Sequence, residues 1–209
     1  MGEKRQARQG ADVLLQEEPL RFQTRKQVGL LGGNFNPVHL AHLVMADQVQ
    51  NQLGLDKVYL MPTYLPPHVD EKKTISSEHR LAMLELAVAD NPCLDIEPIE
   101  LIRKGKSYTY DTMKALKEAN PDTDYYFIIG GDMVEYLPKW HRIDDLLHLV
   151  QFVGIRRPNY PTESTYPIIW VDVPQMAISS TLIRQKVKSG CSTRYLLPEN
   201  VINYIQEKG

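Results

Sequence analysis

The hydrophobic pattern of the chain alternates between two kinds of segment from residue 27 onward. Short continuous apolar runs such as residues 125–129 (YYFII) predict buried strands. Longer segments such as residues 40–53 repeat their apolar side chains every three or four positions, which predicts helices. The predicted strands cover residues 27–31, 57–61, 125–129, 151–156 and 168–171, with an extended segment over 94–101. The predicted helices comprise one capped by Ser77 with Leu81, Leu84 and Val88 on its core face, one that starts at Ser179 or Ser180 and runs to Lys188, and those over 40–53 (ended by Gly54), 110–119, 144–149 and 198–208.

Strands that alternate with helices predict a parallel sheet covered by helices on both faces. We therefore expect one α/β domain over residues 27–209, built on a Rossmann-like, doubly wound parallel sheet. In such a sheet the loops at the carboxyl ends of the strands form the binding crevice. The most distinctive polar residues follow Leu31, Met61, Ile129 and Val171. We expect these four turns to converge on one site.

Composition narrows the class of protein without identifying it. With 209 residues, 43% of them hydrophobic and 24% charged, the chain fits one ordinary folded domain. The net charge of −2 gives no general electrostatic reason to expect DNA or RNA as a partner. Cys93 and Cys191 form no CxxC pair, which argues against a disulfide framework or structural zinc. No apolar run approaches the length that spans a membrane.

The first 26 residues differ from the rest of the chain. They mix basic, acidic and Gln side chains with little sustained apolar pattern. The hydrophobic region of a signal peptide is missing, and the acidic residues argue against an organelle transit peptide. We interpret residues 1–26 as a flexible N-terminal extension without chemistry of its own, and we expect a cytoplasmic protein.

The most informative segment is residues 32–42, which read GGNFNPVHLAH directly after an apolar strand. A Gly-rich turn before a helix brings backbone N–H groups and the positive end of the helix dipole toward a ligand, which suits phosphate. His39 and His42 are i and i+3, so a helix places both imidazoles on one face. A Gly pair alone often only ends a strand, and a lone histidine is often structural. Their combination indicates a nucleotide site much more strongly.

Residues 178–184 (ISSTLIR) form a second motif at a predicted helix start. Serines there are common helix caps. However, Ser180 and Arg184 are i and i+4, so a hydroxyl, free backbone N–H groups and a guanidinium share one helix end, as in a phosphate clamp. By itself this segment favours capping and phosphate binding equally. Beside the first motif, it favours phosphate.

These two motifs resemble the HxGH-like and ISSTxxR-like hallmarks of the HxGH-type nucleotidylyltransferase superfamily. Five further segments are similar to bacterial nicotinate-nucleotide adenylyltransferase: Pro66-Pro67-His68, Ser107-Tyr108-Thr109, residues 127–132 (FIIGGD), residues 137–140 (LPKW) and Arg156-Arg157-Pro158. The resemblance covers roughly residues 27–208, in the family's order. It implies transfer of AMP from ATP to nicotinic acid mononucleotide with release of pyrophosphate.

The resemblance also implies a set of site residues. The attacking phosphate oxygen is already anionic, so no general base is required and catalysis rests on positioning and charge stabilisation. Magnesium is expected as Mg²⁺ held by phosphate oxygens and water, without protein ligands. The expected catalytic residues are His39, His42 and Arg184. The expected ATP-binding residues are Gly32, Gly33, Asn34, Phe35, His39, His42, Gly130, Asp132, Ile178, Ser179, Ser180 and Arg184. The expected mononucleotide-binding residues are Asn34, His68, Thr109, Trp140 and Arg157.

Several of these residues have structural alternatives. Trp140 could stack on the pyridine ring or pack in the core. Asp132 could accept a hydrogen bond from a ribose hydroxyl or cap a helix, and His68 could be a solvated loop residue. Two positions depart from the family pattern, because Ala41 stands where Gly is usual and Asn36 stands where many members have Asp.

Other functions share the phosphate motifs. Pantetheine-phosphate adenylyltransferases and cytidylyltransferases differ in the central segments around residues 107–109 and 137–140. A nucleotide-binding regulator without catalysis fits poorly with the presence of both histidines and Arg184. An aminoacyl-tRNA synthetase core would require an anticodon-binding domain, of which the sequence gives no sign. We expect ATP and nicotinic acid mononucleotide as partners, no nucleic acid or membrane, and a possible homo-oligomer.

Overall fold

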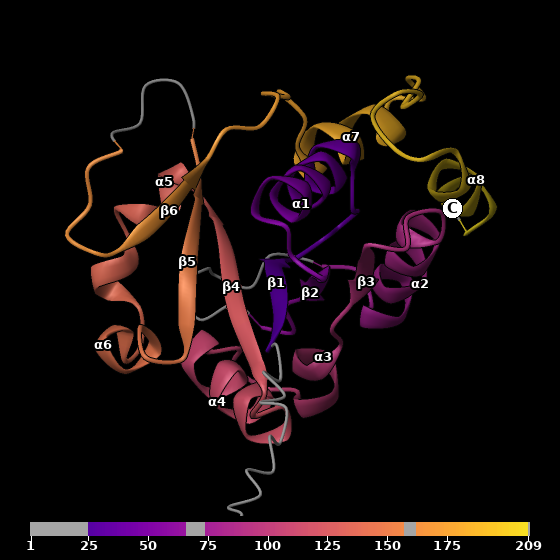
Figure 1. Ribbon diagram of the computed structural model, residues 1–209. Helices are drawn as coiled ribbons and strands as arrows, with labels where there is room; N and C mark the ends of the chain where they lie inside the picture. The colour runs from indigo at the N-terminus through magenta and orange to yellow at the C-terminus, as the bar shows by residue number, and fades with distance from the viewer. Residues whose placement is uncertain (1–24, 66–73, 157–161, 209) are drawn as a thin grey trace, which may run out of the picture.

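The computed structural model of the chain describes residues 25–65, 74–156 and 162–208. Within these residues the strands form a six-stranded parallel sheet in the order β3-β2-β1-β4-β5-β6, which Figure 1 shows from right to left. The strands are β1 Lys26–Gly33, β2 Lys57–Pro62, β3 Leu94–Ile96, β4 Thr123–Gly130, β5 Val150–Ile155 and β6 Ile168–Val171. The predicted doubly wound sheet is confirmed, and its direction of winding switches between β1 and β4.

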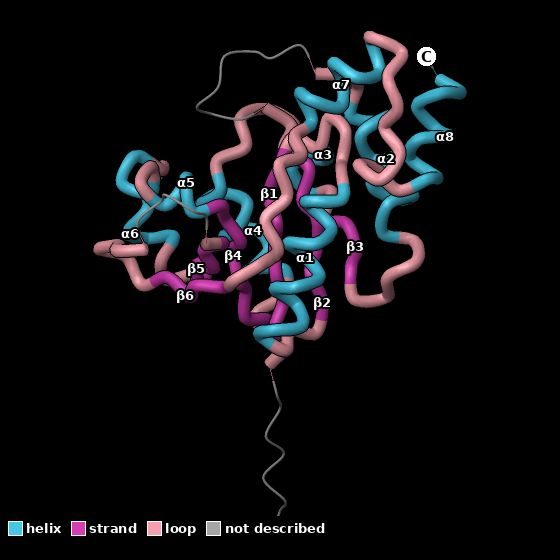
Figure 2. Tube along the Cα trace, turned by 90° about the horizontal axis from the view of Figure 1, so that it is seen from above, coloured by secondary structure: helices cyan, strands magenta, loops and turns pink. Residues whose placement is uncertain are grey.

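Helices cover both faces of this sheet, and the sheet lies between two hydrophobic cores. One core contains residues of α1 Leu40–Leu53, α2 Ser77–Val88, α7 Ser180–Lys188 and α8 Glu199–Lys208. The other contains residues of α3 Ile99–Arg103, α4 Thr109–Ala119, α5 Gly131–Val134, the 3₁₀ helix η1 Leu137–Lys139 and α6 Ile143–Leu146. Figure 2 shows α2 and α8 together at one end of the molecule, with α5 and α6 at the other.

The strands alternate their side chains between these two cores. In β4, Phe127 and Ile129 pack on the α4 side, whereas Ile128 packs on the α1 side. Both faces are therefore buried, which explains the continuous apolar runs in the sequence. Gly29 in β1 leaves room for its neighbour, because a Cβ there would lie 2.6 Å from Cγ2 of Val58.

Most predicted elements lie where the pattern placed them, and the differences are local. The helix over residues 40–53 has the predicted bounds and ends at Gly54 in a left-handed conformation with φ of 62°. Ser76 rather than Ser77 caps α2. The segment over 94–101 is not extended throughout, because β3 ends early and α3 follows. Neither α5 nor η1 was predicted, since elements this short carry no periodic signal.

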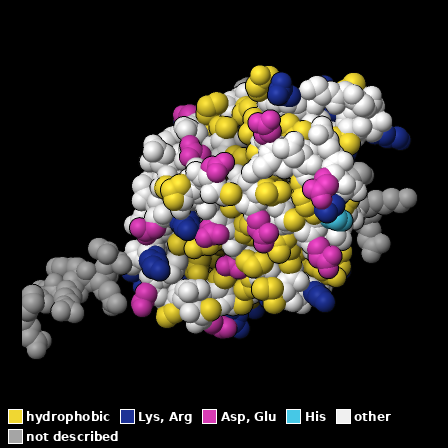
Figure 3. Space-filling model, turned by 90° about the vertical axis from the view of Figure 1, so that its right-hand side faces the viewer, with side chains coloured by type: hydrophobic (Ala, Val, Ile, Leu, Met, Phe, Trp, Pro, Cys, Tyr) yellow, Lys and Arg dark blue, Asp and Glu magenta, His cyan; other side chains and the backbone are white. Residues whose placement is uncertain are grey.

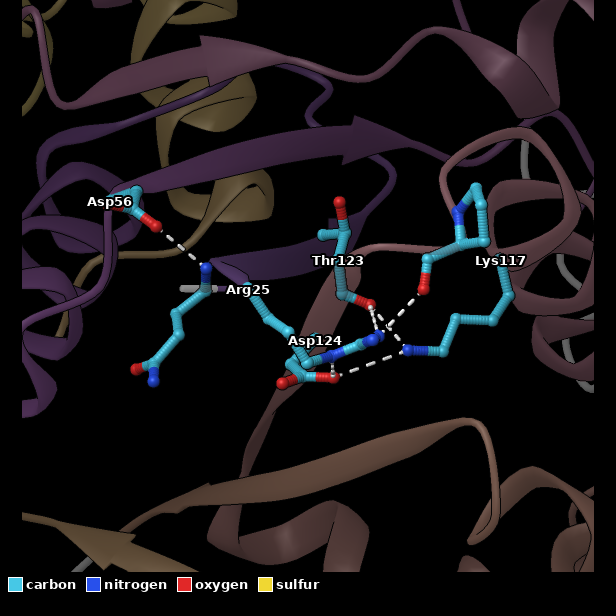
Figure 4. Close-up of polar contacts among 7 residues, drawn as sticks. Arg25, Asp56, Lys117, Thr123 and Asp124 are labelled. Carbon is cyan, nitrogen blue, oxygen red and sulfur yellow. Dashed lines mark hydrogen bonds and ion pairs between the residues drawn. The ribbon is translucent and has the colours of Figure 1, made fainter. Parts of the chain in front are cut away.

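Polar contacts hold the amino-terminal end of the sheet, away from the carboxyl ends of the strands (Figure 4). Arg25 Nε lies 2.8 Å and Lys117 Nζ 3.5 Å from Oδ1 of Asp124. A carboxylate oxygen of Asp56 accepts a backbone N–H of β1 at 2.7 Å. Arg25 and Lys26 therefore already belong to the fold, slightly before the predicted boundary at residue 26, and residues 1–24 lie outside the described part of the chain.

The outer surface bears on the expected partners. In the described ranges, no helix combines the length and apolar character that crossing a membrane requires. On the face over α2 and α8, acidic side chains are interspersed with hydrophobic ones (Figure 3). The expected homo-oligomer stays a prediction.

Candidate active site

Hydrogen bonds at the carboxyl ends of the strands join the segments that follow β1, β2 and β6. Backbone N–H of Thr63, after β2, donates to the carbonyl of Gly33 at 2.9 Å. The Ser180 hydroxyl, at the start of α7, donates to the carbonyl of Pro37 at 2.8 Å. The end of β1 therefore contacts the turn after β2, and the β1–α1 loop contacts the start of α7. The turn after β4 lies at the same edge of the sheet because β1 and β4 are parallel.

The turn after β1 begins later than the sequence suggested. Gly32 and Gly33 pair with β2 as the last residues of the strand and do not form the turn themselves. Phe35 then adopts a left-handed conformation with φ of 45°, which is uncommon for a bulky residue and is held here by its surroundings. Phe35 is buried, with 2% of its surface exposed. Its ring packs against Gly33, because the ring atom Cζ lies 3.0 Å from the position that a Cβ of Gly33 would occupy. We therefore expect Phe35 to contact a nucleotide through its backbone atoms and not through its ring.

His39 and His42 form a stacked pair at the start of α1. His39 is the residue before the helix, and its ring centroid lies 3.6 Å from that of His42 with an interplanar angle of 20°. The backbone N–H of His39 donates to Nδ1 of His42 at 3.2 Å. The Phe35 ring meets His42 edge-on at 4.9 Å between centroids. These contacts fix the orientation of both imidazoles before any ligand binds.

Both imidazoles are neutral near pH 7. Burial lowers the pKa of His39 to about 4, against a small opposing contribution from a backbone hydrogen bond. Burial, reinforced by the positive charge that His39 would carry, lowers the pKa of His42 to about 3. The pair therefore presents hydrogen-bond donors, not fixed positive charges, to an incoming ligand.

The second motif both caps a helix and braces the first. Ser179 precedes α7, and its Oγ accepts the backbone N–H of Leu182 at 3.2 Å, as the capping interpretation expected. Arg184 Nη1 donates to the carbonyl of Asn36 at 2.6 Å, and Nη2 donates to Oγ1 of Thr181 at 3.2 Å. Ser180 and Arg184 thus contact the β1–α1 loop, and Ile178 and Ser179 directly precede them in the chain.

The residues expected beyond β4 occupy helix starts and one loop. Gly130 ends β4 and precedes α5, so it, and not Asp132, takes the cap position, while Asp132 lies in the first turn of α5. Thr109 is the first residue of α4. Trp140 follows η1 and packs edge-on against Phe127 and Phe152, with ring centroids 5.8 and 5.9 Å apart.

The packing of Trp140 supports the core interpretation in part. The indole is half-buried against the α4-side core, but its Nε1 is buried and has no hydrogen-bond partner among the described residues. An unsatisfied indole N–H is unusual in a residue that serves packing alone. His68 and Arg157, the other expected mononucleotide ligands, lie outside the described residues.

The sequence interpretation missed Arg80 of α2. It is buried at 2% exposure and donates to residues at the ends of β1 and β2. A signal was present, because Arg80, Leu84 and Val88 are i, i+4 and i+8 on one helix face. A charged residue on the apolar face of a helix indicates a buried polar role.

Comparison with known proteins identifies the family. The family model for cytidylyltransferase-like proteins matches residues 30–186. A relative from Streptococcus pneumoniae serotype 4, described as a probable nicotinate-nucleotide adenylyltransferase, is 62% identical over 193 residues, which are 92% of each chain. One from Streptococcus mutans serotype c is 61% identical over the same shares. The chain belongs to the nicotinate-nucleotide adenylyltransferase family.

Solved structures support the same fold for this member of the nicotinate-nucleotide adenylyltransferase family. The nicotinic acid mononucleotide adenylyltransferase of Plasmodium falciparum complexed with NaAD matches with a TM-score of 0.73, covering 88% of this chain and 96% of that chain. Its complex with APC matches with a TM-score of 0.72. Because the identity is 18% in both, this likeness bears on the fold alone.

The two departures from the family pattern are accommodated in the interior. Ala41 is buried in the first turn of α1. Asn36 is also buried, and its backbone carbonyl accepts the Arg184 guanidinium. Across the described ranges, no three His, Cys, Asp or Glu side chains are grouped to hold a metal ion.

Proposed function

We propose that this protein transfers the AMP moiety of ATP to nicotinic acid mononucleotide, giving nicotinic acid adenine dinucleotide and pyrophosphate. The observation that carries the proposal is the stacked pair of His39 and His42, held at a helix start against Ser180 and Arg184, in a chain 62% identical to a relative of that name. Helix starts with free N–H groups suit phosphate. The reaction belongs to the biosynthesis of NAD.

The reaction depends more on stabilisation of negative charge than on proton transfer. A phosphate oxygen of the mononucleotide attacks the α-phosphorus of ATP, and the bond from that phosphorus to the bridging oxygen breaks. Pyrophosphate leaves with the electron pair of the broken bond. The nucleophile is already anionic, so the protein mainly aligns two polyanions and stabilises charge on the leaving group.

His42 would act as a neutral hydrogen-bond donor. Its Nδ1 already accepts the backbone N–H of His39, so in the neutral ring the proton lies on Nε2. That N–H is the group that can donate to a phosphate oxygen of ATP. The Nδ1 of His39 is buried and has no hydrogen-bond partner among the described residues.

Arg184 and the start of α7 would bind the β- and γ-phosphates. Nη1 and Nη2 of Arg184 each make one hydrogen bond within the protein, and a guanidinium has five N–H donors. The remaining donors can reach a phosphate while the contact with Asn36 holds the side chain in place. Ser179 and Ser180 expose the first backbone N–H groups of α7 at the same place.

Mg²⁺ fits this site as a cation carried by the nucleotide. This ion keeps several waters in nucleotide sites and binds phosphate oxygens. When bound, it would neutralise part of the charge on the leaving pyrophosphate. No residue of the described chain is assigned as its ligand.

The mononucleotide would bind beside Trp140 and the start of α4. Thr109 contributes a hydroxyl and a backbone N–H at that helix end, and the unpartnered Nε1 of Trp140 adds a donor. Both kinds of group suit the carboxylate or the phosphate of the acceptor. Asn34, His68 and Arg157 remain proposed ligands for the same substrate.

The test is pyrophosphate release from ATP with nicotinic acid mononucleotide, compared with CTP as donor and with nicotinamide mononucleotide or phosphopantetheine as acceptors. We expect turnover with the first pair. We also expect His42→Ala to lower kcat by about a hundredfold or more while the fold is retained. His148→Ala, at an exposed position, is the matched control. Near-normal turnover in a folded His42→Ala protein would exclude the assigned role.

A further inference from the structure

Arg80 is a buried cation that the proposed chemistry does not yet use. It lies in α2 with 2% of its surface exposed, although arginine is almost never fully buried without a partner. Among the described residues it forms no ion pair with a carboxylate, and burial lowers the pKa of its guanidinium with no acidic neighbour to oppose this effect. Its Nε is also buried without a hydrogen-bond partner there.

The contacts of Arg80 all lead to the crevice. One nitrogen, Nη1, donates to the backbone carbonyl of Asn34 at 2.9 Å and to the carbonyl of Thr63 at 2.8 Å, and lies 3.3 Å from Oδ1 of Asn34. Asn34 directly follows β1 and Thr63 directly follows β2. The Asn34 amide in turn donates to Oγ1 of Thr74 at 3.2 Å. Arg80 thus ties together the carboxyl ends of two strands beside the histidine loop.

Neutral carbonyls compensate a buried guanidinium only in part, because they provide partial charges where a carboxylate provides a full one. The imidazoles nearby are neutral, so they supply no competing positive charge. A full negative charge that binds next to Asn34 would find Arg80 beneath it, in a low-dielectric environment that strengthens the attraction. The site thus holds a positive charge for which the described residues supply no anion.

We propose that Arg80 is a positioning residue that holds Asn34 in place and supplies the buried positive charge for a substrate phosphoryl group bound at the carboxyl ends of β1 and β2. This inference rests on the proposed function for the identity of the phosphoryl group, which belongs to ATP or to the acceptor mononucleotide. Arg80 acts through Asn34 and through its charge, without touching the substrate.

The comparison that isolates the charge is Arg80→Lys against Arg80→Gln. Both side chains retain N–H donors for the two carbonyls, but only lysine retains the positive charge. The probes are inorganic pyrophosphate, measured by calorimetry, and the KM values for ATP and for nicotinic acid mononucleotide. We expect Arg80→Lys to stay within about threefold of the unmodified protein and Arg80→Gln to lose about tenfold or more for at least one probe. A loss with pyrophosphate and ATP assigns the group to ATP, and a loss with the mononucleotide alone assigns it to the acceptor.

Asn34→Asp provides an isosteric second test should Arg80→Gln fail to fold. A carboxylate there would lie about 3.3 Å from Nη1 and pair with Arg80. We expect this pair to raise the Tm of the ligand-free protein and to weaken binding of the same probe whose binding Arg80→Gln weakens. The double variant Asn34→Asp/Arg80→Lys should likewise show a raised Tm and weaker binding of that probe.

The outcomes separate this inference from the proposed function. If the Lys and Gln variants bind pyrophosphate equally and share both KM values, or if Asn34→Asp leaves Tm and every affinity unchanged, Arg80 is a structural strut and the inference fails. Pyrophosphate binding needs no acceptor. A protein that does not adenylate nicotinic acid mononucleotide, yet binds pyrophosphate in the Lys but not the Gln variant, rejects the proposed function and retains the role of Arg80.

Discussion

The neutral histidine pair makes the stability of the protein depend on pH in a defined window. In the unfolded chain both imidazoles titrate near pH 6.5, whereas in the folded protein burial lowers the pKa of His39 to about 4 and that of His42 to about 3. Below pH 6.5 the unfolded state therefore binds protons that the native state does not. The contribution of the pair to stability is complete above pH 6.5 and is lost as pH falls toward 4.

The size of the effect follows from these two pKa values. Each group costs about 1.4 kcal/mol per pH unit below its unfolded pKa. Between pH 6.5 and pH 5 this amounts to about 2 kcal/mol for each imidazole. At pH 5 neither ring is protonated in the folded state, so the electrostatic coupling between them does not enter and the two costs add to about 4 kcal/mol. That is a large share of the roughly 5–15 kcal/mol that stabilises a typical domain.

The assay is urea unfolding at half-unit steps from pH 7 to pH 5, followed by far-UV circular dichroism. We expect the His39→Asn/His42→Asn double variant to lose about 4 kcal/mol less than the unmodified protein over this range. Burial raises the pKa of Glu97 and Glu100, which opposes the histidines, but these carboxyls are common to both proteins. His148→Asn, at an exposed position, controls for the loss of a histidine. Parallel pH profiles for the double variant and the unmodified protein would refute the assignment of buried neutral imidazoles.

Two further predictions concern Trp140 and a sheet glycine. Trp140→Ala should raise KM for the mononucleotide at least about tenfold more than KM for ATP. Trp140→Phe keeps the packing on Phe127 but loses the Nε1 donor. Equal changes in both KM values would favour a packing role alone. Gly29→Ala places a Cβ 2.6 Å from Val58 and should lower the free energy of unfolding by about 1–3 kcal/mol. Gly54→Asn, at an open left-handed helix end, should cost less than about 0.5 kcal/mol, and similar losses in both variants would argue against crowding at Gly29.

The fold was predictable because its elements are long and buried on both faces. Residues 125–129 are continuously apolar in the sequence because neighbouring side chains of β4 enter opposite cores. The helix over residues 40–53 is marked by its spacing and by Gly54. The prediction failed where elements are short: α3, α5 and η1 have five, four and three residues, less than the window over which a helical period can be recognised.

The sequence predicted that the two motifs lie close together, but it did not predict the protonation states of their residues. The spacing of His39 and His42 placed them on one face of a helix, and the structure brings their rings together. Nothing in the spacing reveals that burial makes both imidazoles neutral, because that depends on how the whole loop packs. Likewise the sequence suggested Arg184 for phosphate, but its bond to the Asn36 carbonyl comes from a contact 148 positions apart in the chain.

The distribution of charge in the crevice follows from these states. Two imidazoles stacked at 3.6 Å could not both be protonated without strong mutual repulsion in a buried site. A triphosphate nevertheless needs positive charge as well as donors. Two guanidiniums supply positive charge to the loop: that of Arg184, which donates to the Asn36 carbonyl from α7, and that of Arg80, which donates to the Asn34 carbonyl from α2. The histidines then give direction to the phosphates and the arginines give charge, so mild acidification should destabilise the fold before it protonates the histidines and adds positive charge to the site.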